Sequence, residues 1–140
     1  MRKISIFLLA LLLLTGCCKS DVPRIDEYVW ELTSVQSKAQ NGAVVAYGER
    51  GMGTAENAVY VGMVCTAQSG VLTLADISNG KTYTGSYTLL AVDSRTAHYE
   101  ITLEGKSGLA VVAMTTYHDG SQDPTLIIDL KEYVINCFAK

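Results

Sequence analysis

Lys81-Thr82-Tyr83-Thr84-Gly85-Ser86-Tyr87-Thr88 decides the fold class of this chain. Tyrosine and glycine alternate here with residues that carry a hydroxyl or a charge, and Leu89 and Ala91 continue the apolar side of the pattern. Successive side chains of a β-strand point to opposite faces, so a period of two is typical of a strand with one buried face. We therefore predict a strand over 81–91, with Tyr83, Gly85, Tyr87, Leu89 and Ala91 on its apolar face.

The same alternation recurs along the rest of the chain. In 98–104 the apolar face carries Tyr99, Ile101 and Leu103, and in 125–130 it carries Leu126, Ile128 and Leu130. Further strands are predicted over 29–37, 43–47, 58–67, 71–76, 108–118 and 133–138. Turn residues fall between these runs, and Asn79-Gly80 is the strongest hairpin signal. About nine short strands at a spacing of roughly ten residues predict an all-β sandwich or barrel.

Two segments depart from this pattern. The run 108–118 is apolar on both sides near its start. We favour a central strand that is buried on both faces, and the alternative is that one side lines a cavity or a docking surface. The stretch 48–57 is rich in glycine and lacks periodicity, so we expect a long loop or lid there.

The amino terminus has the form of an export signal. Arg2 and Lys3 precede a run of 11 apolar or small residues, Ile4–Leu14, and the run is followed by Thr15-Gly16-Cys17. A membrane-spanning helix needs about 20 apolar residues, so this run predicts a cleaved signal peptide rather than a span. The cleavage point resembles the lipobox of bacterial lipoproteins, and this resemblance implies that Cys17 is acylated. A plain secretory signal with an incidental cysteine is the alternative.

This reading divides the chain into three parts. Residues 1–16 are the expected lipoprotein signal peptide, 17–27 the lipidated amino terminus and tether, and 28–140 the folded domain. The protein would then sit in the bacterial cell envelope, facing outside the cytoplasm, and its covalent lipid would hold it on a membrane.

Length and charge narrow the class of partner. Removing residues 1–16 leaves 124 residues, which suits one domain. The mature chain would carry 9 basic and 14 acidic residues, a net charge of −5. No basic cluster lies outside the signal, so we exclude nucleic acid as a partner.

Two cysteines, Cys65 and Cys137, lie inside the predicted domain. Exported domains meet an oxidising environment, so a disulfide between them is one expectation. It would close a loop of about 70 residues and contribute on the order of 4 kcal/mol. The alternative is a pair of buried thiols that act as small hydrophobic residues.

Short motifs suggest a family. The chain resembles small bacterial lipoproteins with a lipocalin-like, calycin-type domain of unassigned function, on the basis of Trp30-Glu31-Leu32-Thr33-Ser34, Asn41-Gly42 and Gly85-Ser86-Tyr87. The resemblance implies a single antiparallel up-and-down barrel or closed sandwich of about 8–9 strands, with Trp30 plugging one end. It brings no catalytic residues.

The candidate residues for chemistry are few. His98 and His118 have no nucleophile motif around them and are expected on the surface. Asp119 and Asp123 sit in a turn with oxygens at alternate positions, but the loop does not complete a calcium ligand set. We therefore expect no catalytic residue, no metal and no cofactor.

Tyrosines are the remaining candidates for ligand binding, because they combine bulk with a polar tip. Tyr83 and Tyr87 are expected in the core or the barrel lining, whereas Tyr47 and Tyr60 flank the long loop and could form a rim.

These observations favour a non-catalytic binding or interaction module for a small apolar ligand or an envelope protein. A proteinaceous inhibitor of a lysozyme-type hydrolase is the alternative, although Ser107-Gly108-Leu109-Ala110-Val111 lacks the tyrosine that ends the typical Ser-Gly-x-x-Tyr motif of such inhibitors. A purely structural envelope component also remains open.

Overall fold

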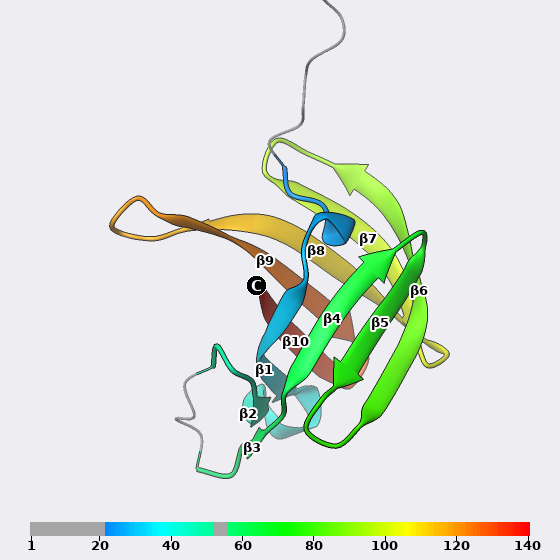
Figure 1. Cartoon of the computed structure of the whole chain (residues 1–140), viewed down its shortest axis with the longest axis vertical. Helices are drawn as coiled ribbons and strands as arrows, with labels where there is room; N and C mark the ends of the chain where they lie inside the picture. The colour runs from blue at the N-terminus through cyan, green and yellow to red at the C-terminus, as the bar shows by residue number, and fades with distance from the viewer. Residues whose placement is uncertain (1–21, 52–55) are drawn as a thin grey trace, which may run out of the picture.

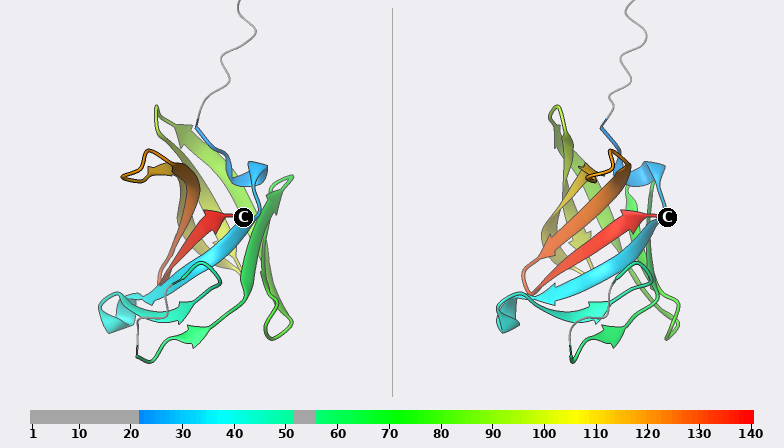
Figure 2. Two further views of the ribbon diagram at one scale, coloured as in Figure 1. Left: turned by 60° about the vertical axis from the view of Figure 1, so that its left-hand side comes forward. Right: turned by 90° about the vertical axis from the view of Figure 1, so that its left-hand side faces the viewer.

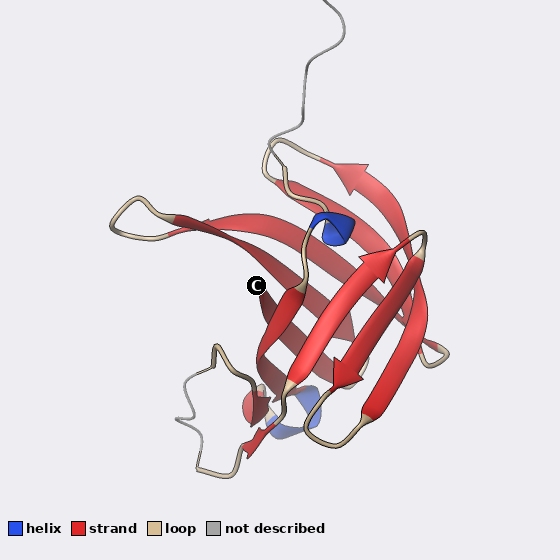
Figure 3. Cartoon of the chain, viewed as in Figure 1, coloured by secondary structure: helices blue, strands red, loops and turns tan. Residues whose placement is uncertain are grey.

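A computed structural model describes residues 22–51 and 56–140, which form an antiparallel β-barrel with short 3₁₀ turns at its two ends (Figures 1 and 3). The elements in chain order are η1 (Ile25–Glu27), β1 (Trp30–Ser37), η2 (Lys38–Gln40), β2 (Ala43–Tyr47), β3 (Val59–Tyr60), β4 (Met63–Gln68), β5 (Val71–Asp76), β6 (Lys81–Val92), β7 (Thr96–Leu103), β8 (Lys106–Thr116), β9 (Gln122–Leu130) and β10 (Tyr133–Ala139).

The barrel closes through β1. Strands β4 to β10 form a meander in which each strand pairs antiparallel with the next. Strand β1 pairs with β10 along its whole length and with β4 through Trp30 and Glu31, which completes a ring of eight strands. Figure 2 shows the ring from the side, with β2 and β3 outside it. The prediction of an all-β, up-and-down closed barrel is confirmed.

The predicted strand 58–67 is wrong in one respect, because it is two strands. Its first part, β3, runs parallel to β2, whereas β4 pairs antiparallel with β5. The chain turns at Val61, whose carbonyl accepts a hydrogen bond from the amide of Met63 at 2.9 Å. A change of partner strand leaves no mark on a period of two, so the sequence pattern could not reveal it.

The interior is built from the faces that the alternation predicted. Tyr99, Ile101 and Leu103 of β7 are buried, and so are Leu126 and Ile128 of β9. Burial of one face per strand is what holds a single-layer barrel together, since each apolar side chain removed from water contributes roughly 1.5–3 kcal/mol.

One end of the barrel is plugged. Trp30 is fully buried, and its Nε1 donates a hydrogen bond to the carbonyl of Ile25 in η1 at 2.8 Å. The amide of Ile25 in turn donates to the hydroxyl of Tyr99 at 3.1 Å. Val22 and Ile25 are both buried, so residues 22–27, which we expected to be tether, belong to the folded body.

The favoured expectation that the strand over 108–118 is buried on both faces is wrong for β8. Ala110 and Val112 face the interior and are buried, but Leu109 on the other side is 55% exposed. The barrel has a single layer, and no second layer of the described residues covers the outer face of β8. An apolar outer side chain therefore stays in contact with solvent.

The burial of the last residues of β6, 89–92, also differs from expectation. Leu89 and Ala91 were predicted on the buried face, yet both are exposed. A register shift between these two residues interrupts the alternation, and this arm of the β6–β7 hairpin reaches beyond the end of the ring (Figure 1).

Candidate functional site

An apolar cavity lies inside the barrel, away from the plug. Its volume is about 290 Å³, and its wall comes from six different strands. The lining residues are Val35, Met63, Leu74, Tyr83, Leu103, Tyr133 and Ile135. Tyr83 follows the β5–β6 turn, Leu103 precedes the β7–β8 turn and Tyr133 follows the β9–β10 turn. These turns all lie at the end of the barrel opposite η1, so the cavity belongs to that end.

The cavity continues into a wider opening of about 620 Å³. Tyr83, Leu103 and Tyr133 line both spaces, and the opening adds charged residues from two turns. These charged residues are Glu104, Lys106, Lys131 and Glu132. We call this opening the mouth. Small-molecule sites are typically concave and mostly apolar, with a few polar groups that orient the ligand, and the cavity with its mouth fits this description.

The tyrosine hydroxyls supply polar groups in the cavity. Neither Tyr83 nor Tyr133 makes a side-chain hydrogen bond to any residue within 22–51 or 56–140. Tyr83 is half-buried, and a half-buried tyrosine hydroxyl usually finds a partner, so a bound molecule could serve as that partner; Tyr133 is 41% exposed, and water can solvate its hydroxyl. At the rim, Lys106 and Glu132 form an ion pair at 3.6 Å.

The four tyrosines named from sequence do not share one site. Tyr83 lines the cavity, whereas Tyr87 lies nearer the plug and packs edge-on against Tyr99 with their ring centroids 6.1 Å apart. Tyr47 and Tyr60 stack edge-on at 5.7 Å on β2 and β3, outside the ring. Tyr60 lines a separate surface groove of about 390 Å³. The structure thus places Tyr83 alone of the four in the cavity wall.

Tyr60 is held by a polar contact. Its hydroxyl donates a hydrogen bond to Glu49 Oε2 at 2.7 Å, and this carboxylate raises the pKa of Tyr60 above its usual value. The contact fastens β3 to the start of the long loop rather than leaving the hydroxyl open for a ligand.

Several cavity residues were missed from the sequence, among them Met63, Tyr133 and Ile135. A signal for them exists. In an up-and-down barrel every second turn lies at the same end, so residues next to alternate turns must share one mouth. Counting turns would have grouped Tyr133 with Tyr83 and Leu103.

The expected disulfide is not formed, because Cys65 and Cys137 are both buried free thiols. The physical reason is the strand between them. Cys65 pairs with Trp30 on one edge of β1, and Cys137 pairs with Leu32 on the other edge. Two strand spacings separate their backbones by roughly 10 Å, which exceeds the reach of a disulfide. The thiols serve as small hydrophobic residues in the core.

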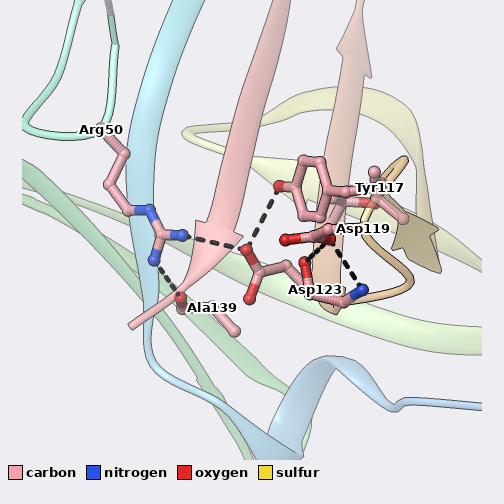
Figure 4. Close-up of polar contacts among 8 residues, drawn as sticks. Arg50, Tyr117, Asp119, Asp123 and Ala139 are labelled. Carbon is pink, nitrogen blue, oxygen red and sulfur yellow. Dashed lines mark hydrogen bonds and ion pairs between the residues drawn. The ribbon is translucent and has the colours of Figure 1, made fainter.

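The two carboxylates of the β8–β9 hairpin, Asp119 and Asp123, already accept hydrogen bonds from neighbouring residues (Figure 4). Asp119 accepts a hydrogen bond from the amide of Ser121 at 2.9 Å, and the contacts with Ser121 hold the pKa of Asp119 below its usual value. Asp123 Oδ2 accepts from Arg50 at 3.1 Å and from the hydroxyl of Tyr117 at 3.2 Å. Across the described chain, no group of three or more His, Cys, Asp or Glu side chains is arranged to hold a metal ion.

Arg50 connects the long loop to the barrel wall. Besides Asp123, it donates to the carbonyl of Ala139 at 3.2 Å, and its guanidinium lies 5.4 Å from the ring centre of Phe138. The expected loop or lid at 48–57 is therefore anchored on β10 at its start. Residues 52–55 of that loop lie outside the described residues.

His98 belongs to a turn rather than to a catalytic set. Its Nε2 lies 2.8 Å from Thr96 Oγ1 and 3.4 Å from Asp93 Oδ2. Asp93 also accepts from the amides of Arg95 and Thr96, both at 2.8 Å. These hydrogen bonds, led by that from the Thr96 hydroxyl, hold the pKa of Asp93 well below its usual range. The network stiffens the tip of the β6–β7 hairpin.

Comparison of the chain with known protein families, with curated proteins and with solved structures finds no match. The predicted lipid attachment at Cys17 lies outside the described residues. Within the described residues, no helix has the length and apolar character needed to cross a membrane.

Proposed function

We propose that this chain is a lipid-anchored, extracytoplasmic binding protein that holds a small apolar or amphipathic ligand at the open end of its barrel. It resembles, on this reading, the lipocalin-like lipoproteins of the bacterial envelope. The observation that carries the proposal is the apolar cavity of about 290 Å³, which joins a mouth of about 620 Å³.

The composition of the two spaces supports an amphipathic ligand. Five aliphatic or thioether side chains and two tyrosines line the inner cavity. Of the two spaces, only the mouth is lined by carboxylates and ammonium groups, and Lys106 and Glu132 form an ion pair there. A ligand with an apolar body and a polar head would match this gradient, because its body leaves water while its head stays solvated.

The proposal of a non-catalytic role rests on the chemistry of the lining. No acid, base or nucleophile within the described residues points into the inner cavity, whose lining is apolar apart from its tyrosine hydroxyls. Catalysis needs groups placed at the reacting atoms, and such groups would have to come from the mouth.

The anchor in this proposal comes from the sequence. A basic start, a short apolar run and the Leu14-Thr15-Gly16-Cys17 site have the order that a lipoprotein signal requires. Mass spectrometry of the processed protein tests it directly, and an unmodified amino-terminal cysteine would exclude the anchor.

Binding can be tested with a fluorescent fatty-acid probe and the protein that starts at Lys19. We expect saturable binding, which Ile135→Phe reduces because the larger ring fills the cavity that Ile135 lines. Val134→Phe is the matched control, since the neighbouring side chain lies on the opposite face of β10. Binding that does not saturate, or that both variants weaken equally, would exclude the cavity as the site.

A further inference from the structure

Four consecutive apolar residues, Leu89-Leu90-Ala91-Val92, are all exposed on the last part of β6. The most exposed of the three large ones is Leu90, at 54%. Single exposed apolar residues are common, but an unbroken run of four on a soluble surface is selected against unless it has a role. We call this run the apolar arm.

The apolar arm lies at the plugged end of the barrel. It forms one side of the β6–β7 hairpin, whose turn residues Ser94 and Arg95 line a groove of about 480 Å³ together with Val22 and Pro23. The first described residues of the chain therefore lie against this hairpin, and Figure 2 shows both at the same end in two views.

The distance from this end to the predicted lipid is short. Four residues lie between Cys17 and Val22, and the five steps along the chain span at most roughly 18 Å when fully extended. An acyl chain on Cys17 would therefore keep the plugged end close to the bilayer surface, whatever path the intervening residues take.

We propose that the apolar arm inserts into the interfacial region of the same bilayer that holds the acylated Cys17, so that the mouth faces away from the membrane. This inference rests on the lipid anchor of the proposed function. Burial of the arm removes its exposed apolar surface from water, which is the general driving force for interfacial binding.

Charge does not supply this attraction. Arg95 is exposed at the tip of the hairpin, but Asp93 lies beside it and Asp119 lies on the neighbouring β8–β9 turn. The partner that fits is therefore an apolar lipid surface and not a strongly acidic one. The hydrogen bonds from the amides of Arg95 and Thr96 to Asp93 fix the turn that follows the apolar arm.

The orientation has a consequence for the cavity. Because the mouth and the plug lie at opposite ends, a ligand would enter from the aqueous side or from a partner protein. A ligand dissolved in the supporting bilayer would have no direct path to Tyr83.

Tryptophan fluorescence can test the inference on the acylated protein in phosphatidylcholine vesicles. Two variants are compared, Leu90→Trp in the apolar arm and Ile77→Trp in the β5–β6 turn, where the native side chain is 71% exposed at the mouth end. The native Trp30 is fully buried and gives the same background in both. We expect brominated lipid to quench the new tryptophan at 90 and to leave that at 77 unquenched. Equal quenching, or none at 90, would overturn the inference.

Two further measurements separate the possible failures. If the processed protein carries no lipid and does not bind vesicles, the anchor fails and the inference falls with it. If it binds vesicles and the tryptophan at 90 stays unquenched, only the orientation is wrong. Self-association of Cys17→Ser protein that Leu90→Asn abolishes would assign the apolar arm to a second copy and would also overturn the inference.

Discussion

Ile25 fastens the plug through both of its backbone groups. Its carbonyl accepts from Trp30 and its amide donates to Tyr99. Each of Trp30→Phe and Tyr99→Phe leaves one buried backbone group unpaired, so we expect each to lower the free energy of unfolding by about 1–3 kcal/mol. Because both act on one residue, the double variant should lose less than the sum, by about 0.5 kcal/mol or more.

Urea denaturation followed by circular dichroism measures these changes, since Trp30→Phe removes the native tryptophan. Tyr87→Phe is the control, because its ring packs on Tyr99 without a hydrogen bond to a described residue. Its stability should stay within about 0.5 kcal/mol of the parent. Full additivity of the two plug variants would show that η1 is held by other contacts.

The buried thiols should be inert in the folded protein. Burial raises the pKa of Cys65 to about 12, and the pKa of Cys137 is raised for the same reason. Only the thiolate reacts with alkylating reagents, so at pH 8 we expect Cys65 to react about a thousandfold or more slowly than an exposed thiol. Thr66→Cys provides that exposed thiol on the outer face of the same strand. Peptide mass spectrometry compares the two rates, and similar rates would mean that β4 opens readily.

At the scale of the element, Gly85 sets the contact between β6 and β7. A Cβ atom at this position would lie 1.7 Å from the carbonyl oxygen of Thr102. Glycine within a strand often marks a tight bend of a barrel wall. We expect Gly85→Ala to lower the free energy of unfolding by about 1–3 kcal/mol, because the two strands must move apart.

Ser86→Ala is the matched control for Gly85→Ala, because Ser86 is the next residue and its side chain is exposed. Its unfolding midpoint in urea should equal that of the parent. A Gly85→Ala midpoint that also equals the parent's would mean that β6 and β7 adjust without cost.

The sequence predicted the bounds of some strands accurately. The bounds 43–47 and 71–76 agree with β2 and β5 residue for residue. The rule of alternation failed where tertiary context decides burial. The predicted apolar face of β6 includes Leu89 and Ala91, which lie past the end of the ring and are exposed, and on β8 an apolar outer side chain has the same sequence signature as an inner one. Neither distinction is encoded in the neighbouring residues.

The candidate site shows the same division. The alternation placed Tyr83 on an inward face, which is correct, and it gave no reason to separate Tyr83 from Tyr87. That separation depends on depth along the barrel, which the position of each residue relative to its turn determines. Tyr47 and Tyr60 were grouped with them by chemistry alone, whereas the side excursion of β2 and β3 takes them outside the ring.

At the scale of the whole molecule, closure of the barrel is uneven. Strand β1 pairs with β10 from Trp30 to Ser37 but with β4 only at Trp30 and Glu31. From Ser34 onward, the edge of β1 on the β4 side pairs with β2 instead of β4. Strand β2 pairs with β1 and β3. The seam between β1 and β4 is therefore the weakest line of the ring, and Met63 lies where the groove outside the seam approaches the inner cavity.

This unevenness should appear in hydrogen exchange. Strand β7 pairs with β6 and β8 along its length, and its pairing with β8 has no irregularity, so its amides should exchange only when the barrel unfolds globally. Strand β2 lies outside the ring and has a two-residue partner in β3, so opening it leaves the barrel closed. We expect amides of Ala43–Tyr47 to exchange on the order of a hundredfold or more faster than those of Ala97–Leu103. Exchange followed by mass spectrometry measures both segments in one sample, and equal protection would show that the excursion and the ring open together as one cooperative unit.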